Sequence, residues 1–357
     1  MDKKNRKPVL YLVSNMYPSK HNPRYGIFVK NFERAVAEDW KIKKIIITKT
    51  NNKIALLFKY IYYYIRIFFL FFKIKRQDLI YVHFPLYAAP PLSIFCFMKA
   101  KIILNFHGSD LVFDNFVKKI LSIFQKCLVK KFYMVVPSEF YKKRLIEMYR
   151  VPSAKIYVYP SGGINPDIFY PKEFTEREFF TVSFVSSFIS GKGWKIFLEA
   201  MRKLKENKDV ENLRIIMVGD GPDKQKILDY IKKYELQVSV HSRLTHEQIA
   251  EIYRQSDVFV FPTTLPESLG LVGLEAMACG TPVIGTNYGG IKTYLKHGTN
   301  GFMFRYGDYE DLSNKIIRFY HLPSWRKLEM QQEAIKTASA YFTSNINKEL
   351  ISFLNKI

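Results

Sequence analysis

Short runs of β-branched and aromatic residues recur along the first half of the chain, and segments with helical periodicity separate them. The runs are continuously apolar instead of alternating, which is typical of parallel strands in a sheet that is covered on both faces. Strands are therefore predicted at residues 8–15, 43–50, 78–84, 101–108 and 134–138, and an amphipathic helix is predicted at 26–40.

The second half repeats this scheme. A segment rich in glycine, proline and asparagine, residues 159–174, indicates a linker between the halves. We predict an α/β protein with two Rossmann-like parallel-sheet domains, residues 1–170 and 171–340, and a helix over 341–357 that packs back on the first domain. Ligands bind beyond the carboxyl ends of such strands, so two facing domains would share one central cleft. The strands of the second domain are predicted at 180–187, 213–221, 238–242, 258–263 and 282–286.

The most apolar stretch, residues 54–75, is long enough to span a bilayer as a helix. Three cations at seven-residue spacing interrupt it, Lys59, Arg66 and Lys73, and burying them unpaired at bilayer depth would be costly. On a helix they form one cationic stripe beside a separate apolar face. This pattern is typical of a helix that lies in the membrane interface, so residues 54–76 are expected to contact an anionic membrane surface with their basic residues toward the headgroups. A buried helix with snorkelling cations is the alternative. The predicted apolar face consists of Phe58, Ile61, Ile65, Phe69 and Phe72.

The formal net charge of +23 is concentrated in the first half of the chain. Residues 1–172 hold 31 lysines and arginines against 10 aspartates and glutamates, whereas the remaining residues hold 24 against 22. Such a field attracts nucleic acid or an anionic membrane surface. Nucleic-acid binding predicts aromatic residues interleaved with basic ones on strands, whereas these basic residues fall mostly on predicted helices. We therefore expect an anionic membrane as the partner and no nucleic acid.

Three cysteines, Cys96, Cys127 and Cys279, are far apart in the sequence and show no metal-binding spacing. We expect them to be small core residues in a reducing compartment. The basic N-terminus is followed by a short apolar run that predicts a first strand and not a secretory signal. A cytoplasmic location is therefore expected, peripheral on the inner face of the cell membrane.

The most specific chemical signal is the segment PTTLPESLGLVGLEAMACGTPVIGT, residues 262–286. A helix that begins near Gly270 would carry Glu275 on its second turn and leave Glu267 in the loop before it. Backbone N–H groups at the helix N-terminus suit a phosphate, and Gly270 lets the backbone approach a ligand closely. These residues indicate a site for an anionic ligand with hydroxyl groups. The alternative is that both glutamates are solvated helix charges.

This segment resembles the E-x(7)-E signature of retaining glycosyltransferases of family 4, and the resemblance spans nearly the whole chain. It implies the GT-B fold, a nucleotide-sugar donor such as a UDP- or GDP-sugar, no cofactor and no metal. It is similar to enzymes of bacterial cell-surface polysaccharide and lipid-linked glycan synthesis. The other matching stretches are GIFVKNFERA (26–35), NFHGSD (105–110), PSGGIN (160–165), SSFISGKG (186–193), VGDG (218–221), GGIKT (289–293) and HGTNG (297–301).

The resemblance also implies roles for single residues. Lys192 would neutralise the diphosphate leaving group, Glu267 would contact hydroxyls of the donor sugar, and Glu275 would bind the ribose hydroxyls. His107 would lie near the reacting sugar, so His107, Glu267 and Lys192 are the expected catalytic residues. Gly26 and His107 are expected on the acceptor side. The expected donor-binding residues are Ser187, Lys192, Gly219, Arg243, Ser268, Leu269, Gly270, Leu271 and Glu275.

The chain departs from the family pattern at three positions. Ser187 stands where the family has a phosphate-binding arginine, and a serine donates one hydrogen bond without a charge. Thr293 stands in place of a glutamate, and Ser161 in place of an asparagine. Of two further polar residues near strand ends, we expect His83 to be structural and Asp110 to cap the following helix.

The resemblance implies transfer of a sugar from a nucleotide-diphosphate sugar to a glycan or lipid-linked acceptor, with retention of the anomeric configuration. The three departures leave one alternative open. In that alternative the protein is a catalytically silent, glycosyltransferase-like partner protein that binds the nucleotide without turning it over.

Overall fold

The structure is a computed structural model that describes residues 7–23, 25–172, 178–242 and 244–357. The chain divides into two compact units. Unit 1 comprises Met1–Gly162 and Ile346–Ile357, and unit 2 comprises Gly163–Asn345. Each unit contains a six-stranded sheet whose neighbouring strands all pair in parallel.

The sheet of unit 1 has the strand order β2-β1-β3-β4-β5-β6. The strands are β1 (Val9–Tyr17), β2 (Lys41–Thr48), β3 (Leu79–His83), β4 (Lys101–Asn105), β5 (Tyr133–Val136) and β6 (Ile156–Val158). The helices are α1 (Ile27–Val36), α2 (Lys53–Lys73), α3 (Pro85–Leu92), α4 (Phe116–Lys131), α5 (Glu139–Tyr149) and α12 (Thr343–Lys356). Short 3-10 turns are η2 (Ser93–Phe97), η3 (Ser109–Leu111) and η4 (Ser153–Lys155).

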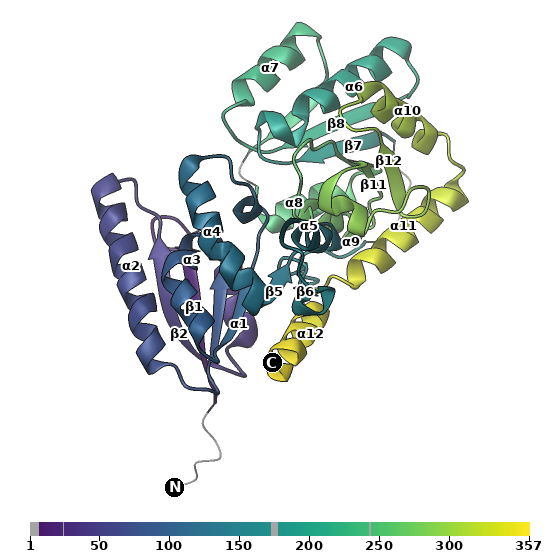
Figure 1. Cartoon of the computed structure of the whole chain (residues 1–357). Helices are drawn as coiled ribbons and strands as arrows, with labels where there is room; N and C mark the ends of the chain where they lie inside the picture. Colours follow the sequence, from purple (N-terminus) through teal and green to yellow (C-terminus); the bar gives the residue numbers. More distant parts are fainter. Residues whose placement is uncertain (1–6, 24, 173–177, 243) are drawn as a thin grey trace. The chain divides into compact units, whose positions relative to one another are not determined.

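Helices cover both faces of this sheet, as its continuously apolar strands require. On one face, apolar residues of α2, α3, α4 and α5 form a core with alternate strand residues such as Val13 and Val82. On the other face, α1 and α12 pack over Leu12 and Tyr81. Figure 1 shows α2 and α4 on either side of α3.

The sheet of unit 2 has the order β12-β11-β10-β7-β8-β9. Its strands are β7 (Phe180–Val185), β8 (Leu213–Val218), β9 (Val238–His241), β10 (Val258–Phe261), β11 (Val283–Thr286) and β12 (Gly301–Phe304). One face packs against α6 (Trp194–Asn207), α7 (Lys224–Lys233) and α10 (Tyr309–Tyr320), and the other against α8 (His246–Arg254), α9 (Leu271–Ala278) and α11 (Ser324–Ser339). Two 3-10 turns, η5 (Ser190–Lys192) and η6 (Gly289–Thr293), follow β7 and β11.

Helix α2 lies on the surface of unit 1 with one narrow stripe buried, formed by Tyr63, Ile67 and Leu70. The side chain of Asn52 caps its N-terminus by accepting hydrogen bonds from the N–H groups of Ile54 and Ala55. Within the described residues it is the one helix long and apolar enough to cross a membrane by length and composition. Only 17% of its apolar window is buried within the described structure, so most of this window is accessible.

The predicted apolar face of α2 points to solvent. Phe58 is 64% exposed, Phe69 53% and Phe72 68%. The predicted orientation of the cationic stripe is wrong for two of its three members. Lys59 donates to the carbonyl and hydroxyl oxygens of Thr48, and Arg66 donates to the carbonyl of Lys44, so both turn toward β2. The free carbonyls at the edge of this sheet satisfy these cations, which leaves the apolar residues outermost.

The structure confirms the α/β class and every predicted strand, and adds two short ones. Strand β6 has only three residues, and β12 begins at Gly301 directly after the turn at 298–300, so neither stands out as an apolar run between loops. The predicted boundary at residue 170 differs from the observed division after Gly162, because Ile164 and Phe169 are buried in the core of unit 2. The prediction of core cysteines holds for Cys279 and is wrong for Cys127, which is exposed.

Candidate active site

The loops that follow β7 and β10 meet beyond the carboxyl ends of these neighbouring strands. Lys192 ends η5, and its ammonium lies 2.5 Å from Oε1 of Glu267 in the loop after β10. The two side chains are only 22% and 14% exposed. The hydroxyl of Thr263 donates to the same Glu267 oxygen at 3.0 Å. Two of the three residues that we expect to be catalytic thus form one partly buried ion pair.

Glycines on both sides of Lys192 let the two loops approach this closely. The carbonyl of Gly191 accepts a hydrogen bond from the N–H of Thr264 at 2.9 Å. Gly193 has φ 78°, and a Cβ there would lie 1.9 Å from the carbonyl oxygen of Pro262. Any other residue at 193 would therefore push the loops apart and separate Lys192 from Glu267.

Helix α9 begins at Leu271, directly after Gly270 at φ 85°. The hydroxyl of Tyr294 donates to the carbonyl of Gly270 at 2.8 Å, and the N–H of Gly290 donates to the carbonyl of Glu267 at 2.9 Å. These contacts fix the loop that leads into the helix. The first-turn N–H groups of a helix have no partner inside it, so this end of α9 can bind an anion.

Glu275 lies on the second turn of α9. Burial raises the pKa of its carboxyl from 4.5 to about 7. Across the described ranges, no residue forms a hydrogen bond or ion pair with this carboxylate, although part of the side chain remains accessible. A carboxylate without donors in a poorly hydrated place suits the hydroxyl groups of a ligand.

The other predicted donor-binding residues lie at this edge of the sheet, except Arg243. Ser187 is exposed two residues after β7. Gly219 directly follows β8 and packs against Ser186, so a Cβ at Gly219 would lie 1.9 Å from the carbonyl oxygen of Ser186. Ser268 and Leu271 are partly buried, whereas Leu269 is 1% exposed, so only its backbone can face a ligand. Arg243 lies outside the described residues.

In unit 1, two histidines meet at the carboxyl ends of β3 and β4. His83 Nδ1 lies 3.0 Å from His107 Nε2 and 3.3 Å from the amide nitrogen of Asn105. The two imidazoles thus share one hydrogen bond, between Nδ1 of His83 and Nε2 of His107. Burial lowers the pKa of His107 to about 3, so the ring is neutral near pH 7.

The surroundings of His107 hold its ring and backbone in place. Phe28 and Phe84 lie with ring centroids 4.5 Å from the imidazole. The Asp110 carboxylate accepts hydrogen bonds from the N–H groups of His107 and Gly108, so it does not cap the following turn as predicted. Burial raises the pKa of Asp110 to about 7. Asp110 therefore fixes the backbone at His107, and within the described structure it forms no hydrogen bond with the imidazole ring.

Gly26 precedes α1 and lies against the end of β1. It has φ 73°, and a Cβ would lie 2.7 Å from the carbonyl carbon of Met16. A larger residue would displace the N-terminus of α1 from the strand ends. Close backbone packing is therefore sufficient to explain why position 26, which is predicted to lie on the acceptor side, is a glycine.

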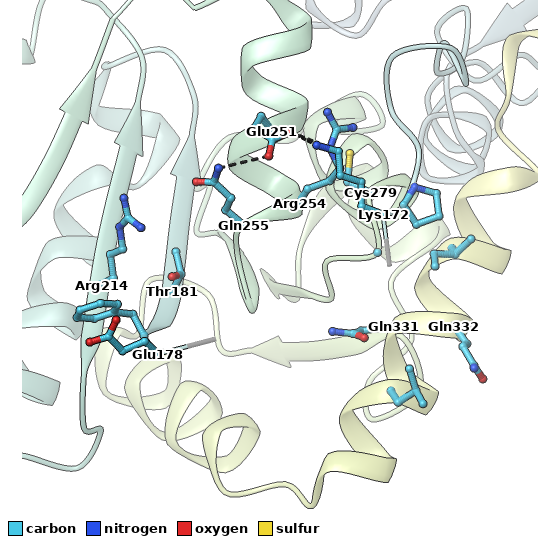
Figure 2. A pocket seen from close by; sticks show the side chains of 15 residues that line it. Lys172, Glu178, Thr181, Arg214, Glu251, Arg254, Gln255, Cys279, Gln331 and Gln332 are labelled. Carbon is cyan, nitrogen blue, oxygen red and sulfur yellow. Dashed lines mark hydrogen bonds and ion pairs between the residues drawn. The ribbon is translucent and has the colours of Figure 1, made fainter. Parts of the chain in front are cut away.

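A separate pocket of about 510 Å³ lies at the opposite, amino-terminal ends of the unit 2 strands, near Thr181 and Arg214 (Figure 2). Its central carboxylate, Glu251, is bonded by Arg254 and Gln255, as the dashed lines show, and by Lys172 at 2.8 Å. The charges of Lys172, Glu251 and Arg254 in this pocket thus already have partners. No group of three or more His, Cys, Asp or Glu side chains that could hold a metal occurs in the described part of either unit.

Several residues of the site were not predicted from the sequence. Thr263 bonds Glu267, Tyr294 bonds the backbone before α9, and the amide of Asn105 contacts the ring of His83. The position of Thr263 directly after a strand end was the available signal. Tyr294 and Asn105 act through the folded chain, and no local pattern marks them.

Two family models match the chain one after the other. The model described as Glycosyltransferase Family 4 matches residues 20–166, and the model described as Glycosyl transferases group 1 matches residues 168–340. An uncharacterized glycosyltransferase of Methanocaldococcus jannaschii is 28% identical over 256 residues, which are 70% of this chain and 67% of that protein. N-acetyl-alpha-D-glucosaminyl L-malate synthase of Bacillus anthracis is 33% identical over 133 residues, 34% of this chain and only 35% of that protein.

Solved structures of similar fold cover nearly the whole chain. HepE of Anabaena in complex with UDP matches with a TM-score of 0.75 and 17% identity, over 98% of this chain and 100% of that one. A further structure of HepE is in complex with UDP-glucose and matches with a TM-score of 0.73. At this level of identity the likeness shows the fold, and it confirms the predicted GT-B class.

Proposed function

Since the chain belongs to the glycosyltransferases of the GT-B type, we propose that it transfers a sugar from a nucleotide-diphosphate sugar to a glycan or lipid-linked acceptor. We propose further that the anomeric configuration is retained and that the product serves cell-surface polysaccharide synthesis. The observation that carries the proposal is the Lys192–Glu267 pair beside the N-terminus of α9. The UDP and UDP-glucose complexes of HepE favour UDP as the donor nucleotide.

The reaction breaks the bond between the anomeric carbon of the sugar and the diphosphate oxygen. Positive charge builds on the sugar and negative charge on the diphosphate. The Lys192 ammonium and the first N–H groups of α9 stabilise the departing diphosphate, as preorganised donors do at a developing charge. Glu267, which the same lysine holds in place, accepts hydrogen bonds from hydroxyls of the donor sugar.

Retention follows when the acceptor attacks from the face that the diphosphate leaves. The acceptor hydroxyl forms the new glycosidic bond, and its proton passes to an oxygen of the leaving diphosphate. The products are the glycosylated acceptor and the nucleoside diphosphate, so no protein nucleophile is consumed. Glu275 binds the ribose hydroxyls, and in unit 1 the neutral ring of His107 hydrogen-bonds a hydroxyl of the acceptor.

The proposal assigns the neutralisation of the diphosphate to protein groups, and hence includes independence from divalent metal. Ser187 contributes no charge to it, so Lys192 carries more of this role than it would beside an arginine. Turnover that persists at full rate in excess chelator supports this part. Loss of turnover in chelator that added Mg²⁺ restores would overturn it.

A two-step experiment tests the function. Stabilisation of the full chain by UDP in a thermal-shift assay without magnesium is expected first, because a ligand that binds only the folded state raises its stability. Consumption of UDP-sugars from a panel, followed by mass spectrometry, is expected second. If UDP stabilises the protein and no sugar is consumed with any acceptor extract, the catalytically silent partner protein is the better description, as Ser187 and Thr293 would favour.

We also propose that unit 1 docks on the cytoplasmic face of the cell membrane through residues 54–76. The exposed apolar face of α2 supports this, since soluble monomers rarely expose so large a contiguous patch. Lys73, Lys75 and Arg76, all exposed, lie at the end of that face and suit anionic headgroups. Co-sedimentation with phosphatidylglycerol vesicles tests it, and equal recovery after Phe69 and Phe72 are both replaced by serine would count against it.

A further inference from the structure

A cavity of about 780 Å³ opens in unit 1 between α2 and α4. Leu57 and Ile61 of α2 line one side, and Val117 and Leu121 of α4 line the other. Tyr87 of α3, the helix that lies between them in Figure 1, contributes to the same cavity. The volume is within the range of pockets that enclose a small organic ligand.

The mouth of this cavity is apolar and exposed. Leu57 and Val117 are each 60% exposed, and Ile61 is 45% exposed. The same kind of surface continues outward along both helices, with Phe58 on α2 and Phe116 on α4 exposed by 64% and 76%. The cavity therefore opens onto the surface that we propose to meet the membrane, and α4 extends that surface beyond residues 54–76.

The floor of the cavity is polar. Asn15, at the end of β1, is 8% exposed and lines the cavity together with Ser109 and Asp110. Its amide nitrogen donates to the Tyr60 hydroxyl at 3.2 Å, whereas its Oδ1 is buried with no hydrogen-bond partner in the described structure. A buried acceptor without a donor is costly, and a ligand hydroxyl would satisfy it.

An apolar mouth above a polar floor matches a molecule with a hydroxylated head and an apolar chain. The sequences of α2 and α4 contain no aspartate or glutamate, and several lysines, such as Lys119 and Lys126, are exposed on α4. This charge favours an anionic amphiphile. The floor lies at the carboxyl ends of the unit 1 strands, where α/β sheets bind their ligands.

We infer that this cavity binds an anionic membrane lipid, with its headgroup hydroxyls at Asn15 and Ser109 and its chain between Leu57 and Val117. The inference rests on the proposed function, because the lipid is then the acceptor. It selects a lipid over a soluble glycan and gives the acceptor a place in unit 1. Each CH₂ group of the chain that is enclosed between the helices is removed from water, so the chain and not the headgroup should dominate the affinity.

Binding of dioctanoyl-phosphatidylglycerol, kept below its micelle concentration, tests the inference by calorimetry on the full chain. Wild-type protein is expected to bind it, and to bind glycerophosphoglycerol, the same headgroup without chains, at least tenfold more weakly. Leu57→Trp and Val117→Trp, which fill the mouth, should each weaken lipid binding at least tenfold. Ile65→Trp is the matched control, because Ile65 is exposed on α2 and does not line the cavity.

Equal lipid affinity in Leu57→Trp, Val117→Trp and Ile65→Trp would overturn the inference, since the lipid would then adsorb to the surface alone. Equal binding of glycerophosphoglycerol would overturn the role of the chain. Stabilisation by UDP, measured on every variant, reports on unit 2 independently. Absent lipid binding with intact UDP stabilisation contradicts the inference only, whereas absent UDP stabilisation of the wild-type protein contradicts the proposed function.

Discussion

Replacing Glu275 by glutamine should remove a pH dependence from nucleotide binding. The carboxylate of Glu275 can accept hydrogen bonds from two ribose hydroxyls, whereas the protonated carboxyl has lost much of that capacity. Burial raises the pKa of this carboxyl to about 7 in the ligand-free protein. Protonation therefore competes with the nucleotide within an accessible pH range.

The magnitude follows from that pKa. One pH unit below it, about a tenth of the carboxyls are ionised, and one unit above it about nine tenths. When only the ionised form binds, the apparent Kd is divided by the competent fraction, so affinity for UDP should fall about tenfold from pH 8 to pH 6. This corresponds to ~1.4 kcal/mol.

Calorimetric titration with UDP at pH 6, 7 and 8 measures this for the wild type and for Glu275→Gln. The phosphates of UDP titrate equally in both experiments, so the difference between the proteins isolates Glu275. We expect the variant to bind more weakly at pH 8 and to lack the additional loss toward pH 6. An identical pH dependence in both proteins, or equal affinity at pH 8, would refute the assignment of Glu275 to the ribose.

The same substitution should stabilise the ligand-free protein at high pH. Because the pKa of the carboxyl is raised in the folded state, the wild-type protein loses free energy of unfolding as the pH rises from 4.5 through 7. In urea unfolding, Glu275→Gln should therefore be more stable than the wild type at pH 8 by at most ~3 kcal/mol, and equally stable near pH 4. Lys192→Ala should lower kcat by ~10²–10³-fold with a smaller effect on KM, because the lysine charge is needed most as the diphosphate departs. Steady-state kinetics with the UDP-sugar identified in the panel measures both constants, and a wild-type kcat in the variant would refute this role of Lys192. Gly193→Ala should lower the free energy of unfolding by at least ~2 kcal/mol, because the strain of a positive φ adds to the clash with Pro262. Gly298→Ala is the control, since Gly298 also has a positive φ but nothing lies within 4 Å of its added Cβ, and it should lower this free energy by only ~1 kcal/mol. Equal melting temperatures of the two variants would contradict the loop packing.

The parts of the fold that the sequence predicted are those in which a local pattern determines the structure. The buried strands of both sheets stand out as continuous apolar runs, and Gly270 marks the start of α9 because a left-handed residue precedes the helix. Strand β12 escaped prediction because it begins at Gly301 directly after the turn residues 298–300, which reads as a loop. The exposure of Phe69 agrees with the interfacial interpretation of residues 54–76, which rested on the three interrupting cations, because the apolar pattern alone does not distinguish a face on a core from a face on solvent.

The candidate site shows the same division. Lys192 and Glu267 were both predicted, but their ion pair depends on two loops that are 75 residues apart and joined by the hydrogen bond from Thr264 to Gly191. The turn of Lys59 and Arg66 toward β2 was missed, because carbonyl groups at a sheet edge leave no trace in sequence. Side-chain chemistry was thus predictable, whereas partners supplied by distant backbone were not.

The most direct test of the central claim is transfer of labelled sugar from a UDP-sugar panel to a lipid extract by the full chain, with partition of the label into the organic phase as the readout. We predict label in the lipid fraction with the wild-type protein, release of UDP in equal amount, and loss of both with Lys192→Ala. A protein that UDP stabilises but that moves no sugar from any member of the panel, or a Lys192→Ala variant that transfers as fast as the wild type, would contradict the account.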